Sequence, residues 1–421
     1  MSRVTKEMKW WRFMDPTKAI YISGFLDFFG VSMVIPLISN HARDLGASPT
    51  MAGFIGSVYG CIQLFSSPLV GRWSDVSGRK YCLLWSLFFT ACGYMSLGFS
   101  TSLIALFLTR IPLGIFKHSQ SISKSLLADM LPPDKQSAVH GQFNSVSSIG
   151  FILGPVVSGH IVEMAGGFHS VTLLCGAIFM LNGVLVWCCF PDVKSKSHGL
   201  DRDESSTSLQ KLGSDEFNFS PKKIFQFKSL NWSVFWDLFL ARFCLGLSLL
   251  LFRSNFSLML REKFDMSPLG LGYLISYSGV ISAMCGLFSG VISKYYQNDM
   301  RLYKHLAILM TLTMIFFVFT STFWWYVFLL IPLSFTSMNL RVVGTSILIS
   351  RGGKKEIGAL IGLSQSIMSI ARMFAPLLSG ILLEISPNGP PIVGAGMAAL
   401  AVLIMGIKWR NCGEQNRPKQ E

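Results

Sequence analysis

The chain has 421 residues, of which 51% are hydrophobic and only 14% are charged, and its mean hydropathy is +0.49. Too few polar side chains are present to cover a water-soluble globule of this size, which excludes an ordinary soluble protein. The formal net charge of +14 is a property shared with nucleic-acid-binding proteins, but the cations lie in loops between apolar segments. Their distribution therefore excludes nucleic acid as a partner.

Twelve apolar windows along the chain are bounded by charged or Gly-, Pro- and Asn-rich breaks. A hydrocarbon core about 30 Å thick needs roughly 20 apolar residues for each helical crossing, and the windows have about this length. We therefore predict an all-α integral membrane protein with twelve transmembrane helices in a lipid bilayer. The predicted helices are 19–39, 51–71, 81–100, 102–128, 141–164, 170–190, 234–257, 268–292, 303–322, 324–349, 357–384 and 390–408.

Lysine and arginine residues lie mainly on one side of these helices. If both termini are cytosolic, the outer loops hold only Arg43, Arg261 and Lys263 as cations. The positive-inside rule then predicts a multi-pass protein with both termini in the cytosol, and it does not distinguish the plasma membrane from an endomembrane. The first window contains Asp27 and has no cleavage site after it, so we interpret it as a retained helix.

A polar stretch at 191–233 separates six predicted helices from the six that follow it. We interpret this stretch as a cytosolic linker between an N-terminal bundle, 19–190, and a C-terminal bundle, 234–408. The segments 1–18 and 409–421 are predicted to be cytosolic tails.

The two halves also repeat each other in sequence, with an offset that drifts from 219 to 221 residues. Parallel repeats of this kind form two six-helix bundles that rock around a site near the bilayer midplane, so the repeat predicts alternating access. Pro49, Gly53 and Ser57 pair with Pro268, Gly272 and Ser276; Ile111, Pro112 and Leu113 pair with Ile331, Pro332 and Leu333; Gly141, Pro155 and Gly159 pair with Gly362, Pro376 and Gly380.

A short basic loop follows the second predicted helix. Its motif residues are Gly71, Asp75, Gly78, Arg79 and Lys80. The loop resembles the cytoplasmic gate of the major facilitator superfamily, which implies that Asp75 and Arg79 join neighbouring helices in the outward-facing state and that Gly71 approaches the other half. The alternative is a solvated turn with a helix-capping aspartate. The sequence departs from the family pattern at two positions. Trp73 replaces a smaller apolar residue, and Lys294 stands in the second half where the matching gate acid would be.

The fifth predicted helix contains a run of small residues with one proline. Its motif residues are Gly150, Gly154, Pro155, Ser158 and Gly159. The run resembles the helix 5 motif of proton-linked antiporters in the same superfamily, with Ser158 in place of a glycine. Small residues four apart also permit close helix contact, and a proline kinks a helix. A packing seam without any coupling role is therefore an equal alternative.

The first helix, from Gly24 through Asp27 and Gly30 to Pro36, resembles that of the tetracycline-resistance branch, as does Asp129 after the fourth helix. Over the whole chain, the segments around Leu45, Gly114, Lys117 and Ala375 resemble the domain-containing protein 9 family of the superfamily, whose members are orphan transporters. The resemblance implies the major facilitator fold of two six-helix bundles, and it hardly restricts the substrate.

Several cations fall within the apolar windows, where an ionised side chain is costly unless it faces water or a partner. On the fourth helix, Arg110, Lys117 and Lys124 are seven residues apart and are predicted to form one stripe. We expect Lys124 to reach the cytosolic surface and Arg253 the outer one. The remaining cations predict a cavity for an organic anion, with neutral, amphipathic or cationic solutes as alternatives. These candidate substrate-binding residues are Lys117, Arg242, Arg341 and Arg372.

Three residues are candidates for proton coupling: Asp27, Arg110 and His118. Burial raises a carboxyl pKa and a nearby cation lowers it, so a moving cation could switch Asp27 during transport. The alternatives are a permanent ion pair for Asp27, a packing role for Arg110 and an ordinary hydrogen bond for His118.

The sequence therefore predicts a monomeric secondary transporter of a small-molecule substrate, with protons as a possible second substrate. No metal or cofactor is expected, because the seven histidines and nine cysteines lack ligand spacing and no nucleotide-binding loop is present. A transport-inactive membrane receptor or trafficking partner is the main alternative, favoured by Lys294 and Ser158. A membrane enzyme is disfavoured by the same absence of site motifs.

Overall fold

The computed structural model describes residues 15–164, 167–191, 232–296, 298–351 and 357–412, so the predicted linker and most of both predicted tails lie outside the described residues. The first helices are α1 (Pro16–Asp44), α2 (Pro49–Ser77), α3 (Arg79–Gly98), α4 (Leu103–Phe116), α5 (Ser119–Met130), α6 (Pro133–Met164) and α7 (Gly167–Cys189). The later helices are α9 (Trp232–Ser254), α10 (Phe256–Phe264), α11 (Pro268–Tyr296), α12 (Asp299–Phe319), α13 (Phe323–Arg351), α14 (Ile357–Ile385) and α15 (Gly389–Cys412).

Side-chain caps and prolines determine where several of these helices begin. The side chain of Ser48 accepts a hydrogen bond from the backbone nitrogen of Met51 at 3.3 Å, and Pro49 occupies the first turn of α2. Ser102 caps α4 in the same way, through the backbone nitrogen of Ala105 at 3.2 Å. Each cap satisfies an amide that the first helical turn leaves unpaired, and proline at that position gives up no helical hydrogen bond.

Within the described ranges, eleven helices are long and apolar enough to cross a bilayer. The remaining predicted crossing, the fourth at 102–128, is present but is broken into α4 and α5 at Lys117 and His118. The prediction of a single continuous helix there was therefore wrong. The side chain of Gln63 donates to the Lys117 carbonyl at 3.1 Å, and Ser66 donates to the Gly114 carbonyl at 2.8 Å. These α2 side chains satisfy the carbonyls that the break releases, which lets the irregular backbone persist inside the bundle.

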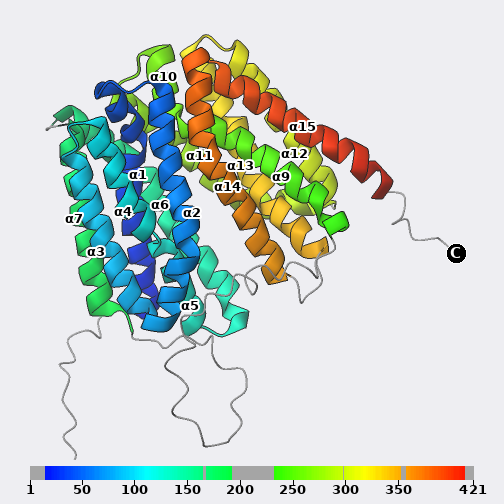
Figure 1. Cartoon of the computed structure of the whole chain (residues 1–421). Helices are drawn as coiled ribbons and strands as arrows, with labels where there is room; N and C mark the ends of the chain where they lie inside the picture. The colour runs from blue at the N-terminus through cyan, green and yellow to red at the C-terminus, as the bar shows by residue number, and fades with distance from the viewer. Residues whose placement is uncertain (1–14, 165–166, 192–231, 297, 352–356, 413–421) are drawn as a thin grey trace, which may run out of the picture.

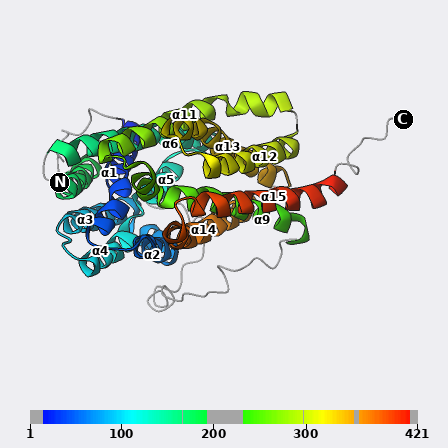
Figure 2. The same ribbon diagram turned by 90° about the horizontal axis from the view of Figure 1, so that it is seen from above.

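The helices form two groups that correspond to the predicted bundles. Figure 1 shows α1 to α7 on one side and α9 with α11 to α15 on the other; α10 lies against the end of α1 where the groups meet, and the groups diverge toward α5. Figure 2, seen from above, shows the groups side by side, with α2 next to α14 and α6 next to α11. We call these two ends of the molecule the α10 end and the α5 end.

Glycines permit backbone contact between the groups. A Cβ atom on Gly53 would lie 2.2 Å from the carbonyl oxygen of Pro376, and one on Gly272 would lie 2.2 Å from that of Pro155. Gly53 pairs with Gly272, and Pro155 with Pro376, in the sequence repeat. The α2–α14 and α6–α11 contacts are therefore copies of one another, as parallel repeats about an axis through the interface require.

Ion pairs join the groups at the α10 end. Arg261 of α10 donates to Asp44 of α1 at 2.9 Å, and Arg43 lies 3.8 Å from Glu262. Burial raises the pKa of the Glu262 carboxyl above its ordinary value, so acidification removes its charge earlier than that of an exposed glutamate and weakens the pair with Arg43. Gly71, near the opposite end of α2, meets no atom within 4 Å where a Cβ would stand. The contacts thus hold the α10 end closed.

Alanine at Gly53 or Gly272 should prevent this closure, because the added methyl group would overlap a carbonyl oxygen. Overpacking of this kind costs about 1–3 kcal/mol, so we expect Gly53→Ala and Gly272→Ala to shift the population toward separated α10 ends by roughly fivefold to a hundredfold. Distances between spin labels on α2 and α14 measure the shift. Gly396→Ala is the control, since a Cβ there meets nothing within 4 Å. Unchanged distances in both test variants would contradict the packing account.

Candidate functional site

Asp27 and Lys117 form a buried ion pair at the break between α4 and α5. The ammonium group of Lys117 lies 2.7 Å and 2.8 Å from the two carboxylate oxygens of Asp27, and 3.0 Å from the hydroxyl of Ser119. The Ser119 hydroxyl also donates to Asp27. Asp27 is 1% exposed and Lys117 is 8% exposed, so each charge depends on the other for its stability in the bundle.

This arrangement changes the expected role of Lys117. The sequence placed it in an anion-binding cavity on one stripe with Arg110 and Lys124, but the helix break removes the regular spacing on which the stripe depends. Lys117 instead neutralises Asp27 and lies 5.1 Å from the ring of Phe179. The ammonium of Lys124 lies 5.8 Å from the ring of Phe143. Both lysines therefore contact groups of the N-terminal bundle.

Arg110 and His118 are also enclosed in the N-terminal bundle. Arg110 of α4 is 5% exposed, and its Nε and Nη2 atoms have no hydrogen-bond acceptor among the described residues. His118 lies next to Lys117, and its Nε2 atom is 2.9 Å from the Ser66 hydroxyl. Asp27, Lys117 and His118 thus meet at one helix break, and Arg110 supplies a second buried cation on α4.

The gate residues join three helices of the N-terminal bundle. Arg79 at the start of α3 is 8% exposed, forms an ion pair with Asp75 of α2 and donates to Asp129 of α5 at 2.9 Å. The loop is therefore more than a solvated turn. Gly78 has φ of +97°, a conformation that a side chain disfavours, and it makes the turn between α2 and α3. Lys80 follows it, half-buried.

The helix 5 motif lies on α6, which is the fifth predicted crossing, and it packs this helix against α1 and α11. A Cβ on Gly150 would lie 2.4 Å from the Phe25 carbonyl oxygen of α1, and one on Gly159 would lie 2.8 Å from Cα of Leu269 in α11. Gly154 likewise approaches α1, and Ser158 is buried with its hydroxyl donating to the Pro155 carbonyl at 3.1 Å. These contacts give the motif a packing role, and a coupling role remains a proposal.

Arg341 lies within electrostatic range of three other arginines of the C-terminal bundle. Arg253 interacts with Arg341, and Arg341 interacts with Arg372 and Arg242. Arg242 donates to the Thr345 hydroxyl at 3.1 Å, and across the described helices none of the four has a carboxylate partner within ion-pair distance. Arg242, Arg341 and Arg372 thus lie on the C-terminal bundle together with Arg253, and Lys117 lies apart from them in the N-terminal bundle. Their role in substrate binding stays a prediction.

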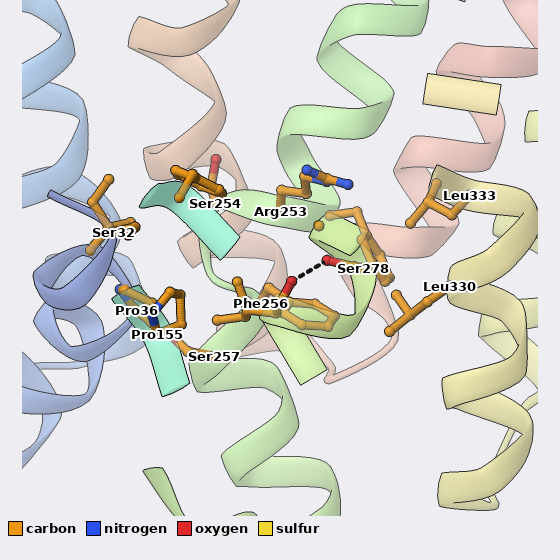
Figure 3. A pocket seen from close by; sticks show the side chains of 15 residues that line it. Ser32, Pro36, Pro155, Arg253, Ser254, Phe256, Ser257, Ser278, Leu330 and Leu333 are labelled. Atoms are coloured by element: carbon orange, nitrogen blue, oxygen red, sulfur yellow. Dashed lines mark hydrogen bonds between the residues drawn. The ribbon is translucent and has the colours of Figure 1, made fainter. Parts of the chain in front are cut away.

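Arg253 lines a cavity of about 240 Å³ between the bundles. Arg253 was predicted to reach the outer surface, which is incorrect, because α9 continues almost without interruption into α10 and places Arg253 well inside the combined helix. Figure 3 shows Pro36 and Pro155 on one side of the cavity and Leu330 and Leu333 on the other, with Arg253 between them. The hydroxyl residues Ser32, Ser254, Ser257 and Ser278 complete its polar lining.

A second hollow, of about 500 Å³, lies between α3 and α7. Tyr81, Trp85 and Trp187 line it together with aliphatic residues, and it contains no charged side chain. Its place on the N-terminal bundle is away from the arginine group. Among the residues the structure describes, no three His, Cys, Asp or Glu side chains are grouped so that they could hold a metal ion.

Comparison with known proteins identifies the family. Residues 20–376 and 238–421 match the Major Facilitator Superfamily. The chain belongs to this superfamily. It is 24% identical over 396 residues to solute carrier family 22 member 18 of Mus musculus, with 93% of this chain and 94% of the relative covered. Transport proteins of the superfamily are multi-pass membrane proteins rather than enzymes, and the eleven apolar helices in the described part of the chain agree with this.

Two solved structures share the fold. The human organic anion transporter MFSD10 (TETRAN) aligns with a TM-score of 0.65 and 18% identity, covering 93% of this chain and 98% of its own. A bacterial homolog of the human lysosomal transporter Spinster, in an inward-facing and unoccupied conformation, aligns with a TM-score of 0.72 and 12% identity, covering 96% and 98%. The twelve-crossing, two-bundle arrangement is consistent with both.

Removing one member of the Asp27–Lys117 pair should destabilise the protein, because it leaves the other charge buried alone. We expect Asp27→Asn and Lys117→Met each to cost about 3–5 kcal/mol and the double variant to recover most of this loss. Thermal unfolding of the purified protein in detergent measures the series. Asp44→Asn is the control, since it breaks an exposed ion pair and should cost at most about 1 kcal/mol. Single variants as stable as this control would show that the buried pair does not form.

Proposed function

We propose that this protein is a secondary transporter that moves a small organic anion through the space between its two bundles by alternating access. The observation that carries the proposal is the group of four arginines on the C-terminal bundle, for which no carboxylate partner exists among the described residues. Arg253, Arg341 and Arg372 are exposed although they belong to apolar helices. A cation on an apolar helix is costly unless it faces water or a partner, and a substrate anion between the bundles would be such a partner.

The conformation supports a rocking motion between bundles. The α10 end is closed by ion pairs and backbone contacts, whereas Gly71 and Gly290 meet no atom within 4 Å where a Cβ would stand. These two glycines correspond in the sequence repeat. If both termini are cytosolic, as we propose from the charge distribution, the separated α5 end faces the cytosol and the conformation is inward-facing, with Gly71 and Gly290 not in contact with the other bundle.

Proton-coupled antiport is the mechanism we propose for energising transport. A proton on Asp27 would leave Lys117 without its counter-charge, and both residues lie at the break between α4 and α5. Protonation would therefore change the contact between α1 and that break. Arg110 and His118 are close enough in the same bundle to respond to this change in charge.

The chain is further proposed to stand within the tetracycline-resistance-like branch, near major facilitator superfamily domain-containing protein 9, and to act as a monomer.

The alternative function is a transport-inactive receptor or trafficking partner. Lys294, in place of a second gate acid, favours it. Asp299 weakens that argument, because its carboxylate accepts hydrogen bonds from Ser293 and Ser346 at 2.6 Å each and joins α12 to α11 and α13.

Uptake into proteoliposomes tests the proposal. A panel of radiolabelled organic anions, neutral solutes and cations is offered with and without a pH gradient. We expect anion uptake that the gradient accelerates, a loss of about tenfold or more in Arg341→Gln and Arg372→Gln from lost charge-assisted hydrogen bonds, and no acceleration in Asp27→Asn. Arg301→Gln, an exposed position on α12, is the control. If the wild-type protein moves no member of the panel, the transporter proposal fails and the receptor alternative gains support.

A further inference from the structure

The cavity between the bundles has one charged side chain and largely apolar walls. Arg253 supplies the charge, and Ile35, Phe151, Phe252, Phe256 and Leu333 are among the apolar residues around it. Arg253 has no hydrogen bond or ion pair with any described residue, and more than a third of its surface is exposed. A guanidinium group in such a setting attracts one carboxylate or sulfonate, which it can bind through two parallel hydrogen bonds.

The two bundles contribute different chemistry to this cavity. The C-terminal bundle brings Arg253, which is the charged residue among those that line the cavity. The N-terminal bundle brings no charge to the lining, because the residues that it contributes are apolar apart from Ser32. Instead it presents Phe151, whose ring packs edge-on against Phe28 with centroids 6.1 Å apart. A ligand between the bundles would therefore meet a cation on one side and an aromatic surface on the other.

Helix geometry holds these groups in place. Asn255 lies between α9 and α10, two residues after Arg253, and is 2% exposed. Its side-chain amide donates to the Pro376 carbonyl of α14 at 3.1 Å, and its oxygen lies 3.4 Å from the hydroxyl of Ser39 in α1. The break between α9 and α10 is thus attached to both bundles, and the position of Arg253 depends on the closed α10 end.

We infer that the substrate of the proposed transporter is a small amphipathic monoanion whose anionic head binds Arg253 and whose apolar body lies against Phe151. This inference rests on the proposed function and names its substrate class. The cavity volume of about 240 Å³ is below the roughly 300–1,000 Å³ of pockets for drug-sized ligands, which favours an aromatic or medium-chain carboxylate over a larger conjugate. Arg253 is the head-binding residue and Phe151 the specificity-determining one.

Binding and uptake of benzoate, acetate and benzamide separate the two roles. We expect Arg253→Gln to weaken benzoate and acetate binding alike, by about tenfold to a hundredfold, and Arg253→Lys to restore part of it. Phe151→Ala should weaken benzoate binding about tenfold and leave acetate binding unchanged, because only benzoate buries a ring. Benzamide, which has the ring without the charge, should bind poorly to every variant.

Matched controls are Arg301→Gln and Phe316→Ala, both at exposed positions on α12, and size-exclusion chromatography confirms that each variant is folded. Calorimetry in detergent measures binding, and proteoliposomes measure uptake. Equal affinity for benzoate in the wild type and in folded Arg253→Gln overturns the inference while leaving anion transport intact. Absence of benzoate binding to the wild type overturns it as well.

The same head-and-body chemistry is present in a fatty acid that enters from the bilayer. Oleate carried in phosphatidylcholine vesicles is therefore compared with octanoate added in water. We expect Arg253-dependent uptake of octanoate. Binding of oleate alone would overturn the assignment to a small solute. Benzoate binding that depends on Arg253, without uptake of any member of the panel, would instead contradict the transporter proposal.

Discussion

The arrangement of the two bundles depends on direct backbone contact between them at positions where glycine has no side chain. Gly53 faces the Pro376 carbonyl and Gly272 faces the Pro155 carbonyl, at distances that leave no room for a methyl group. Because both contacts occur at one end of the bundles, the opposite end is free to separate. These two contacts set the distance between the bundles and therefore the width of the cavity beside Arg253. Close packing of small residues is the main source of helix association in lipid, where apolar burial gives little advantage.

Charge is divided unequally between the bundles. The N-terminal bundle pairs its buried acid, Asp27, with Lys117. At the α5 end it pairs Arg79 with Asp75 and Asp129. The C-terminal bundle pairs Asp237 with Arg351, but four of its arginines have no carboxylate partner among the described residues. Mutual repulsion among these arginines opposes folding, so a counter-charge that arrives from solution would be stabilising. That division is the physical basis for proposing an anion as the transported species.

Apolar length, loop charge and the internal repeat were sufficient to predict the architecture, because each follows from the bilayer and from the symmetry of the bundles. They were insufficient for the fourth crossing, since the break at Lys117 depends on Gln63 and Ser66 of α2, which are remote in sequence. The candidate site was predicted in part. Arg242, Arg341 and Arg372 stay predicted anion-binding residues, whereas Lys117 is paired with Asp27, which lies 90 residues away in the sequence. Arg253 was assigned to the outer surface because the length of the α9–α10 crossing was underestimated, and Ser254, Asn255 and Ser257 were the polar residues that marked the break.

The interrupted fourth crossing has a consequence for biogenesis. α4 has 14 residues and α5 has 12. Helix α5 contains Lys124, one glutamine and several serines. A segment of this length and polarity partitions poorly from the translocon into lipid by itself. Lys117 gains its counter-charge only from Asp27, which is synthesised much earlier and is held in α1. The fourth crossing therefore depends on the first for its place in the membrane, and these two parts of the chain have to meet before the bundle is complete.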